Sequence, residues 1–123
     1  HTLLAAAEIA TGFVALNLAP AMNVPSALLA RADLLIVNEL EANWYGDALQ
    51  AQDGLVAITY GRRGAALFKR GKQIAAAPTP EVNAIDTVGA GDTFTAALSV
   101  ALIEDMNHEA ALKFACAAAA LAR

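Results

Sequence analysis

The sequence predicts an α/β domain in which a mainly parallel sheet carries helices on both faces. Short aliphatic runs alternate along the chain with stretches of helical periodicity, which is typical of this class. The 123 residues are 58% hydrophobic and 16% charged, and the mean hydropathy of +0.48 indicates heavily buried elements. Neither an internal repeat nor a long linker interrupts the pattern, so residues 1–123 are expected to form one domain.

Strands are expected wherever a short apolar run is bounded by turn residues. Residues 13–16 (FVAL), 34–37 (LLIV) and 55–59 (LVAIT) have the aliphatic composition of buried strands. A hairpin is predicted from 65–69 and 73–76 through Arg70-Gly71. A further strand, 82–85, leads into a glycine-containing motif.

Helices are expected between these runs. The predicted segments are 3–10 with Gly12 as its stop, 25–30 opened by Pro25, 39–45 closed by Gly46, a helix after Gly91, and 109–121 capped by Asn107. Amphipathic spacing supports the helix after Gly91, as shown by Phe94, Ala97, Leu98, Ala101 and Leu102. The last helix is apolar almost all round, which predicts burial on several sides. The connection 43–54 is short, as if a helix were missing from it.

Charge and cysteine content narrow the possible partners and the compartment. A formal net charge of −4 argues against nucleic-acid binding. No uncharged apolar run reaches the roughly 18–20 residues of a membrane span, so we expect no membrane partner. Cys116 is the only cysteine and is expected to be a small buried hydrophobe. With no visible signal peptide, a cytoplasmic location is expected, and a homodimer is compatible with the sequence.

Five of the eight basic residues fall in one short stretch: Arg62, Arg63, Lys69, Arg70 and Lys72. A solvated hairpin is the favoured interpretation, because charge clusters are usually solvated surface. The alternative is a positive field beside an anionic ligand. Elsewhere, His108 is expected on a solvent-facing helix start, and Trp44 and Tyr45 are expected as core or rim aromatics.

The most informative segment runs from Asp86 to Phe94 and reads DTVGAGDTF. Its glycines allow close approach of the backbone to a ligand, and a helix start offers N–H groups to a phosphate. The third glycine of a dinucleotide fingerprint and the lysine of a P-loop are both missing. The plainer alternative is that Asp92 and Thr93 only cap a helix.

This segment resembles the signature of the ribokinase-like (PfkB-type) carbohydrate kinase family. Two upstream motifs strengthen the resemblance: Asn38-x-x-Glu41 after a strand, and Thr59-Tyr60-Gly61-Arg62-Arg63-Gly64. Residues 17–21 (NLAPA) also resemble an early family segment. The motifs occur in the family's order and match the C-terminal half of a family member. The resemblance implies a three-layer ribokinase-like fold and ATP-dependent transfer of phosphate to a primary hydroxyl of a small sugar, such as fructose, ribose or 2-dehydro-3-deoxygluconate.

In such a kinase Asp92 would take the proton of the acceptor hydroxyl, and the N–H groups of Gly89, Ala90 and Gly91 would form an anion hole. The resemblance implies that Asn38 and Glu41 orient Mg²⁺, its waters and the ATP phosphates. The same two residues could instead form a helix capping box, and both roles are compatible.

The resemblance also implies nucleotide contacts from the turn at 59–64 and, in some relatives, a monovalent cation such as K⁺ at the positions of Asp86 and Val88. Asp86 could equally cap its own turn. Three other functions stay open at this point: a nucleoside kinase, a non-catalytic nucleotide-binding or regulatory module, and a structural α/β unit.

Overall fold

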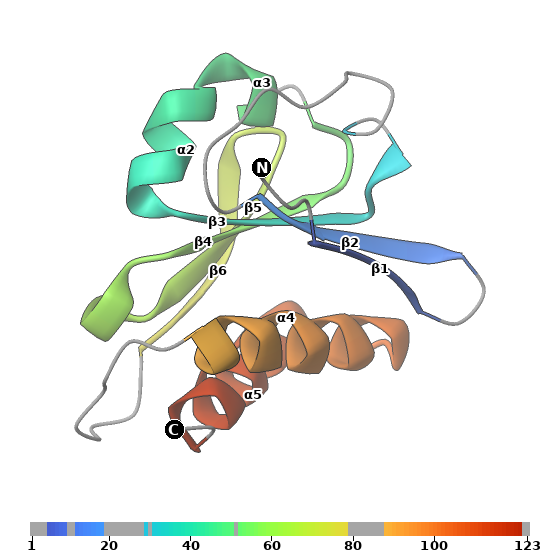
Figure 1. Ribbon diagram of the computed structural model, residues 1–123, viewed down its shortest axis with the longest axis vertical. Coiled ribbons are helices and arrows are strands. Elements are labelled where there is room, and N and C mark those ends of the chain that lie inside the picture. The colour runs from blue at the N-terminus through green and yellow to red at the C-terminus, as the bar shows by residue number, and fades with distance from the viewer. Residues whose placement is uncertain are drawn as a thin grey trace.

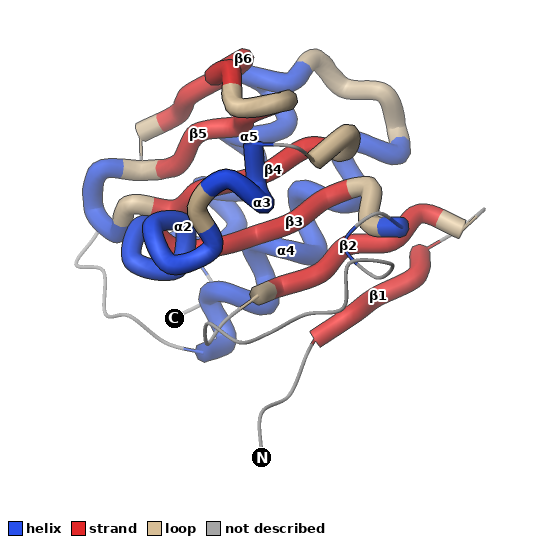
Figure 2. Tube along the Cα trace, turned by 90° about the horizontal axis from the view of Figure 1, so that it is seen from above, coloured by secondary structure: helices blue, strands red, loops and turns tan. Residues whose placement is uncertain are grey.

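In the computed structural model the described residues are 5–9, 12–18, 29, 31–50, 52–78 and 88–121. They form one six-stranded sheet with helices on both faces (Figures 1 and 2). The strands are β1 (Ala5–Ile9), β2 (Phe13–Asn17), β3 (Leu34–Asn38), β4 (Leu55–Thr59), β5 (Ala65–Lys69) and β6 (Lys72–Ala77). The predicted α/β class is confirmed.

The sheet is mixed, and its strands lie in sequence order. β2, β3 and β4 are parallel neighbours, whereas β1 pairs antiparallel with β2, and β5 and β6 continue the sheet antiparallel from β4. Parallel pairing is therefore confined to the middle of the sheet. The carboxyl ends of β2, β3 and β4 share one edge, which is the usual ligand-binding edge of open α/β sheets.

Two helical layers cover the sheet (Figure 1). One contains α2 (Glu39–Tyr45) and the four-residue α3 (Asp47–Gln50), and the other contains α4 (Val88–Ile103) and α5 (His108–Leu121). The connection 43–54, from which a helix was expected to be missing, contains the helix α3. None of the helices in the described part of the chain is long and apolar enough to cross a membrane.

Alternation along the central strands produces two cores. In β3, Leu34 and Ile36 enter the core under α4 and α5, whereas Leu35 and Val37 enter the core under α2. All four side chains are buried, as expected for strands covered on both faces. The predicted core face of α4 is confirmed, with Phe94, Leu98 and Ala101 buried and Ala97 and Leu102 packed against them.

The helix predicted at 3–10 is wrong, because residues 5–9 form β1. Its five residues pair with β2, from Ala5 opposite Asn17 to Ile9 opposite Phe13. Alanine favours helices, but propensity is a weak prior that strand pairing overrides. Gly12, at φ 82°, therefore belongs to a turn between strands.

Most other element predictions are confirmed, including the strands at 13–16, 34–37 and 55–59, the hairpin, and the helix at 39–45. The helix α4 begins at Val88, earlier than predicted. The predicted strand 82–85 lies outside the described residues, as does the helix predicted at 25–30 except for Leu29, which is helical.

The expectation for the last helix needs correction. Its buried residues form one stripe, whereas Phe114 and Leu121 are 49% and 81% exposed. The predicted cap is confirmed, because the side chain of Asn107 accepts hydrogen bonds from the N–H groups of Glu109 and Ala110. The helix is therefore an amphipathic surface helix built mostly from small residues.

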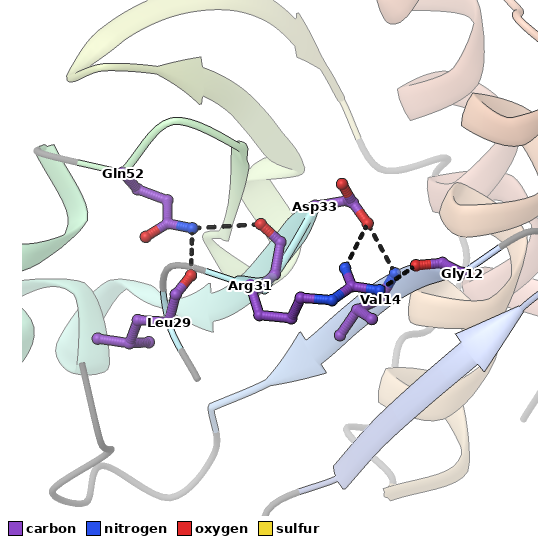
Figure 3. A network of polar contacts seen from close by, with 7 residues as sticks. Gly12, Val14, Leu29, Arg31, Asp33 and Gln52 are labelled. Atoms are coloured by element: carbon purple, nitrogen blue, oxygen red, sulfur yellow. Dashed lines mark hydrogen bonds and ion pairs between the residues drawn. The ribbon is translucent and has the colours of Figure 1, made fainter. Parts of the chain in front are cut away.

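A group of polar contacts lies where the parallel strands β2, β3 and β4 begin, at the edge opposite their carboxyl ends (Figure 3). The Asp33 carboxylate accepts a hydrogen bond from the Val14 N–H at 2.8 Å, and Arg31 donates to the Gly12 carbonyl at 2.9 Å. The buried Gln52 amide donates to the carbonyls of Leu29 and Ala32. These bonds hold the starts of β2, β3 and β4 together, away from the motifs at their carboxyl ends.

Candidate nucleotide and phosphate site

Two of the predicted motifs lie side by side at the carboxyl ends of β3 and β4. Asn38, the last residue of β3, is the register partner of Thr59, the last residue of β4. The Thr59 hydroxyl also donates to the Val37 carbonyl at 3.4 Å. The parallel register therefore brings together two sequence motifs that are separated along the chain.

The start of α2 is a complete capping box. The Asn38 Oδ1 accepts a hydrogen bond from the Glu41 N–H at 2.8 Å, and the Glu41 Oε1 accepts one from the Asn38 N–H at 3.0 Å. Glu41 is buried, whereas Asn38 is exposed. The cap predicted as the alternative role is thus present. It uses one of the two carboxylate oxygens of Glu41, so the carboxylate retains capacity for a cation or its waters.

Backbone hydrogen bonds close the turn after β4. The segment Gly61–Arg63 forms the short 3-10 helix η1. The Tyr60 N–H donates to the Gly64 carbonyl at 2.8 Å, and the Gly64 N–H donates to the Gly61 carbonyl at 3.2 Å. Both glycines have positive φ, 63° and 98°, as the predicted glycine-framed turn requires. A Cβ on Gly64 would also collide with the carbonyl oxygen of Ala77, so the turn packs closely on the end of β6.

An ion pair connects this turn to the start of α2. The Arg63 Nη2 lies 2.7 Å from the Glu39 Oε1, and the guanidinium carbon lies 5.2 Å from the centre of the Tyr60 ring. Sequence reasoning singled out Arg63 but missed Glu39. The available signal was the acidic residue directly after Asn38, which becomes informative only when β3 and β4 are known to be neighbours.

The glycine motif lies at the start of α4. Val88, Gly89, Ala90, Gly91 and Asp92 form the first five residues of this helix. The glycines are thus part of the helix rather than a loop before it. Their side chains, that of Asp92 included, lie outside the described part of the structure, as do Asp86 as a whole and the side chain of Arg62.

The starts of α2, η1 and α4 lie toward the same end of the sheet, with α2 and α4 on opposite faces (Figures 1 and 2). The first N–H groups of a helix have no partner within the helix. Backbone donors of α4 therefore lie at the same end of the sheet as the Asn38–Glu41 cap. Oxygen donors such as those of Asn38 and Glu41 suit Mg²⁺. Among the described side chains there is no group of three or more His, Cys, Asp or Glu residues able to hold a metal.

The basic stretch divides into two parts. Lys69 pairs in register with Leu55, at the beginning of β4, so the tip of the hairpin lies at the edge opposite the motifs. Lys69, Arg70 and Lys72 are exposed, and Arg70 pairs with Asp53. The solvated-hairpin interpretation therefore fits these three residues, and Arg63 alone of the described basic side chains in the stretch lies at the motif edge.

Other candidate groups have structural environments. Burial raises the pKa of the Cys116 thiol from 9.0 to about 11, which keeps it protonated and unreactive at neutral pH. His108 is exposed at the start of α5, as predicted. Tyr45 packs against the core under α2. The ring of Trp44 makes an edge-to-face contact with the ring of Tyr45, with 4.9 Å between the ring centres. Trp44 is 54% exposed, which makes it a rim aromatic.

The family model described as "pfkB family carbohydrate kinase" matches residues 1–123. The chain belongs to this family. It is 38% identical over 114 residues to a ribokinase of Bacillus subtilis, covering 88% of this chain and 39% of that protein. A second relative, a ribokinase of Arabidopsis thaliana, is 49% identical over 67 residues, covering 54% of this chain and 18% of that protein.

Solved structures confirm the ribokinase-like fold. The structure of Arabidopsis thaliana ribokinase complexed with ribose and ATP superposes with a TM-score of 0.71 at 33% identity. The match covers 87% of this chain and 40% of that chain. The chain thus spans about two fifths of the length of the Bacillus relative and of this structure.

Proposed function

We propose that the protein is an ATP-dependent kinase that phosphorylates a primary hydroxyl of a small sugar. One observation supports the proposal: the Asn38–Glu41 cap, the 59–64 turn and the start of α4 at Val88 lie at the same end of the sheet, where α/β folds bind ligands. Membership of the pfkB family and similarity to ribokinases support a sugar as the acceptor. The candidate acceptors are three small sugars: ribose, fructose and 2-dehydro-3-deoxygluconate. ATP is the phosphoryl donor.

Phosphoryl transfer depends mainly on positioning and on charge stabilisation. We assign Asp92 as the general base that accepts the proton of the attacking hydroxyl. Gly89, Ala90 and Gly91 are assigned to the anion hole, because a turn of glycine and alanine lets a phosphoryl group approach the backbone donors.

Asn38 and Glu41 are assigned to the metal side of the site. Their oxygen atoms would hold Mg²⁺ through its waters, and Thr59, Tyr60, Gly61, Arg62, Arg63 and Gly64 would contact the nucleotide. Bound Mg²⁺ would neutralise charge on the ATP phosphates. Asp86 and the backbone of Val88 are assigned to a monovalent cation such as K⁺, and the intact protein is assigned to the cytoplasm.

The test is a coupled ADP-release assay on the intact gene product, with the three sugars and a nucleoside as acceptors. The substitution Asp92→Asn should lower kcat by about 10²–10⁴-fold, because it removes the general base while keeping the side-chain shape. Calorimetry should show unchanged ATP binding, and thermal unfolding should show an unchanged Tm.

Asp105→Asn is the matched control, since it makes the same chemical change just beyond the other end of α4, where Asp105 is exposed. It should leave kcat unchanged. Near-native turnover of the Asp92→Asn protein would contradict the assignment. Turnover of the nucleoside alone would make the protein a nucleoside kinase, and ATP binding without turnover of any acceptor would favour a regulatory module.

A further inference from the structure

We propose that Glu39 is a positioning residue for nucleotide binding, which acts by holding the guanidinium of Arg63. This inference rests on the proposed function, and specifically on nucleotide contact by the turn at 59–64. Glu39 is one of the two variable positions of the Asn-x-x-Glu motif, and the inference gives it a role in positioning the Arg63 side chain. Glu39 would couple the metal side of the site, at the start of α2, to the nucleotide turn after β4.

The first step is the place of the ion pair in the fold. Asn38 and Thr59 are register partners, and beyond them the two chains leave the sheet in different structures, α2 and η1. The hydrogen bond from Arg63 to Glu39 joins these structures directly after they separate, across 24 residues of sequence. Since Glu39 directly follows the capping residue Asn38, the ion pair links the turn to the residue beside the cap.

The second step is how the guanidinium is held. Glu39 accepts one charge-assisted hydrogen bond at 2.7 Å, and the ring of Tyr60 supports the group at 5.2 Å. The backbone N–H of Arg63 also donates to the Tyr60 carbonyl at 3.2 Å, which fixes where the side chain begins. Arginine has five N–H donors in a rigid fork, and the Glu39 bond uses one of them. The others could bind phosphate oxygens without release of Glu39.

The third step separates this role from stability. The side chains of Arg63 and Glu39 are 68% and 51% exposed, and exposed ion pairs contribute little to folding. Glu39 also places a negative charge in the first turn of α2, which stabilises the helix start. This contribution does not require the ion pair with Arg63. A positioning role therefore predicts an effect on nucleotide affinity that exceeds any effect on Tm.

The chain offers a matched pair as a control. Lys113 and Glu109 form an exposed ion pair at 3.2 Å, with both side chains 59% exposed. It lies in the first turns of α5, beside the end of α4 that is remote from the glycine motif. Its loss should resemble the loss of the Glu39–Arg63 pair in stability and differ from it in nucleotide affinity.

The experiment is a double-mutant cycle in the intact protein, using Glu39→Gln, Arg63→Ala and the double variant. Calorimetric Kd for Mg·ATP and steady-state KM for ATP are measured, together with KM for the accepted sugar, kcat and Tm. Glu39→Gln should raise Kd and KM for ATP about three- to fivefold. Arg63→Ala should raise them by about tenfold, because the donors to phosphate are also lost. The double variant should match Arg63→Ala, and Glu39→Asp should recover part of the loss.

Each result decides the matter. A non-additive cycle with unchanged KM for the sugar and unchanged Tm supports the positioning role. An additive cycle, or equal rises in KM for ATP and for the sugar, overturns it. So does a loss of ATP affinity in Glu109→Gln as large as that in Glu39→Gln. If the unsubstituted protein binds no ATP, the proposed function fails together with this inference, whereas ATP binding with an additive cycle refutes this inference alone.

Discussion

The two helices that begin at the motif edge, α2 and α4, start with different kinds of residues. The seven-residue α2 is capped by side chains of its own segment, since Asn38 and Glu41 exchange hydrogen bonds with each other's backbone. The first turn of α4 reads Val88, Gly89, Ala90, Gly91, and none of these side chains can accept a hydrogen bond. The start of α2 is thus capped by polar side chains, whereas the first turn of α4 consists of small and apolar residues.

The two helices also differ in how they are held. Phe94, Leu98 and Ala101 of α4 are buried in the core that the sheet shares with α5. By contrast, Leu40 and Trp44 of α2 are 79% and 54% exposed, and Glu41 is the buried residue of this helix. Apolar packing thus holds α4 from Phe94 onward, beyond its first turn. The polar start of α2 contributes both to structure and to the proposed metal site.

The largest effect is expected at the turn 59–64, which follows β4 and forms an ion pair with the start of α2. Gly64→Ala should lower the free energy of unfolding by about 3 kcal/mol or more, because it combines a strained φ of 98° with a collision against the Ala77 carbonyl. Urea unfolding measures the loss. The matched change is Gly61→Ala, at φ 63°, where the added Cβ would meet no atom beyond its chain neighbours within 4 Å; it should cost about 1 kcal/mol. Equal losses would show that backbone strain alone governs this turn.

The next effect concerns the first turn of α4 and should separate stability from activity. Gly89→Ala should stabilise the helix by about 0.5–1 kcal/mol, because alanine is the better helix former. It should also lower kcat by about tenfold or more, since a methyl group crowds the approach of the phosphoryl group to the backbone. Thermal unfolding and the ADP-release assay measure the two changes.

The control is Ala110→Gly, the reverse change in the first turn of α5. It should cost a similar free energy and leave kcat unchanged. If Gly89→Ala increases stability with full activity, the glycine has no role in phosphoryl transfer, and α4 begins like an ordinary helix.

The parts of the fold that the sequence predicts are those specified by local signals, and the parts that it misses depend on non-local contacts. The bounds of α2 were predictable because Asn38 and Gly46, which flank it, carry local capping signals. The strand Leu55–Thr59 was predictable because aliphatic and β-branched residues run without interruption between turns. The strand Ala5–Ile9 was not, because its alanines favour helix and its structure depends on pairing with β2.

The site shows the same limit. The sequence motifs identified Asn38, Glu41 and the 59–64 turn, each of which is a local pattern. The relation between Glu39 and Arg63 depends on the parallel register of β3 and β4, which no local pattern specifies. The earlier start of α4 was missed because glycine is a poor helix former, although a helix start tolerates it.

The smallest effect tests whether Glu41 has a role beyond its cap. Glu41→Gln keeps an amide oxygen that can accept the Asn38 N–H, so the cap survives and Tm should change little. It removes the negative charge, and the Mg²⁺ concentration for half-maximal turnover should rise about fivefold. Titration of Mg²⁺ at fixed ATP gives this value.

Asn107→Ala makes the complementary change, because it removes the cap of α5 and leaves the motif edge intact. It should cost about 1 kcal/mol of stability with an unchanged Mg²⁺ requirement. If Glu41→Gln also leaves that requirement unchanged, the capping box is purely structural. The starts of α2 and α4 would then divide into one structural and one chemical element. A raised Mg²⁺ requirement with an intact cap would instead mean that the same carboxylate serves the helix through one oxygen and the cation through the other.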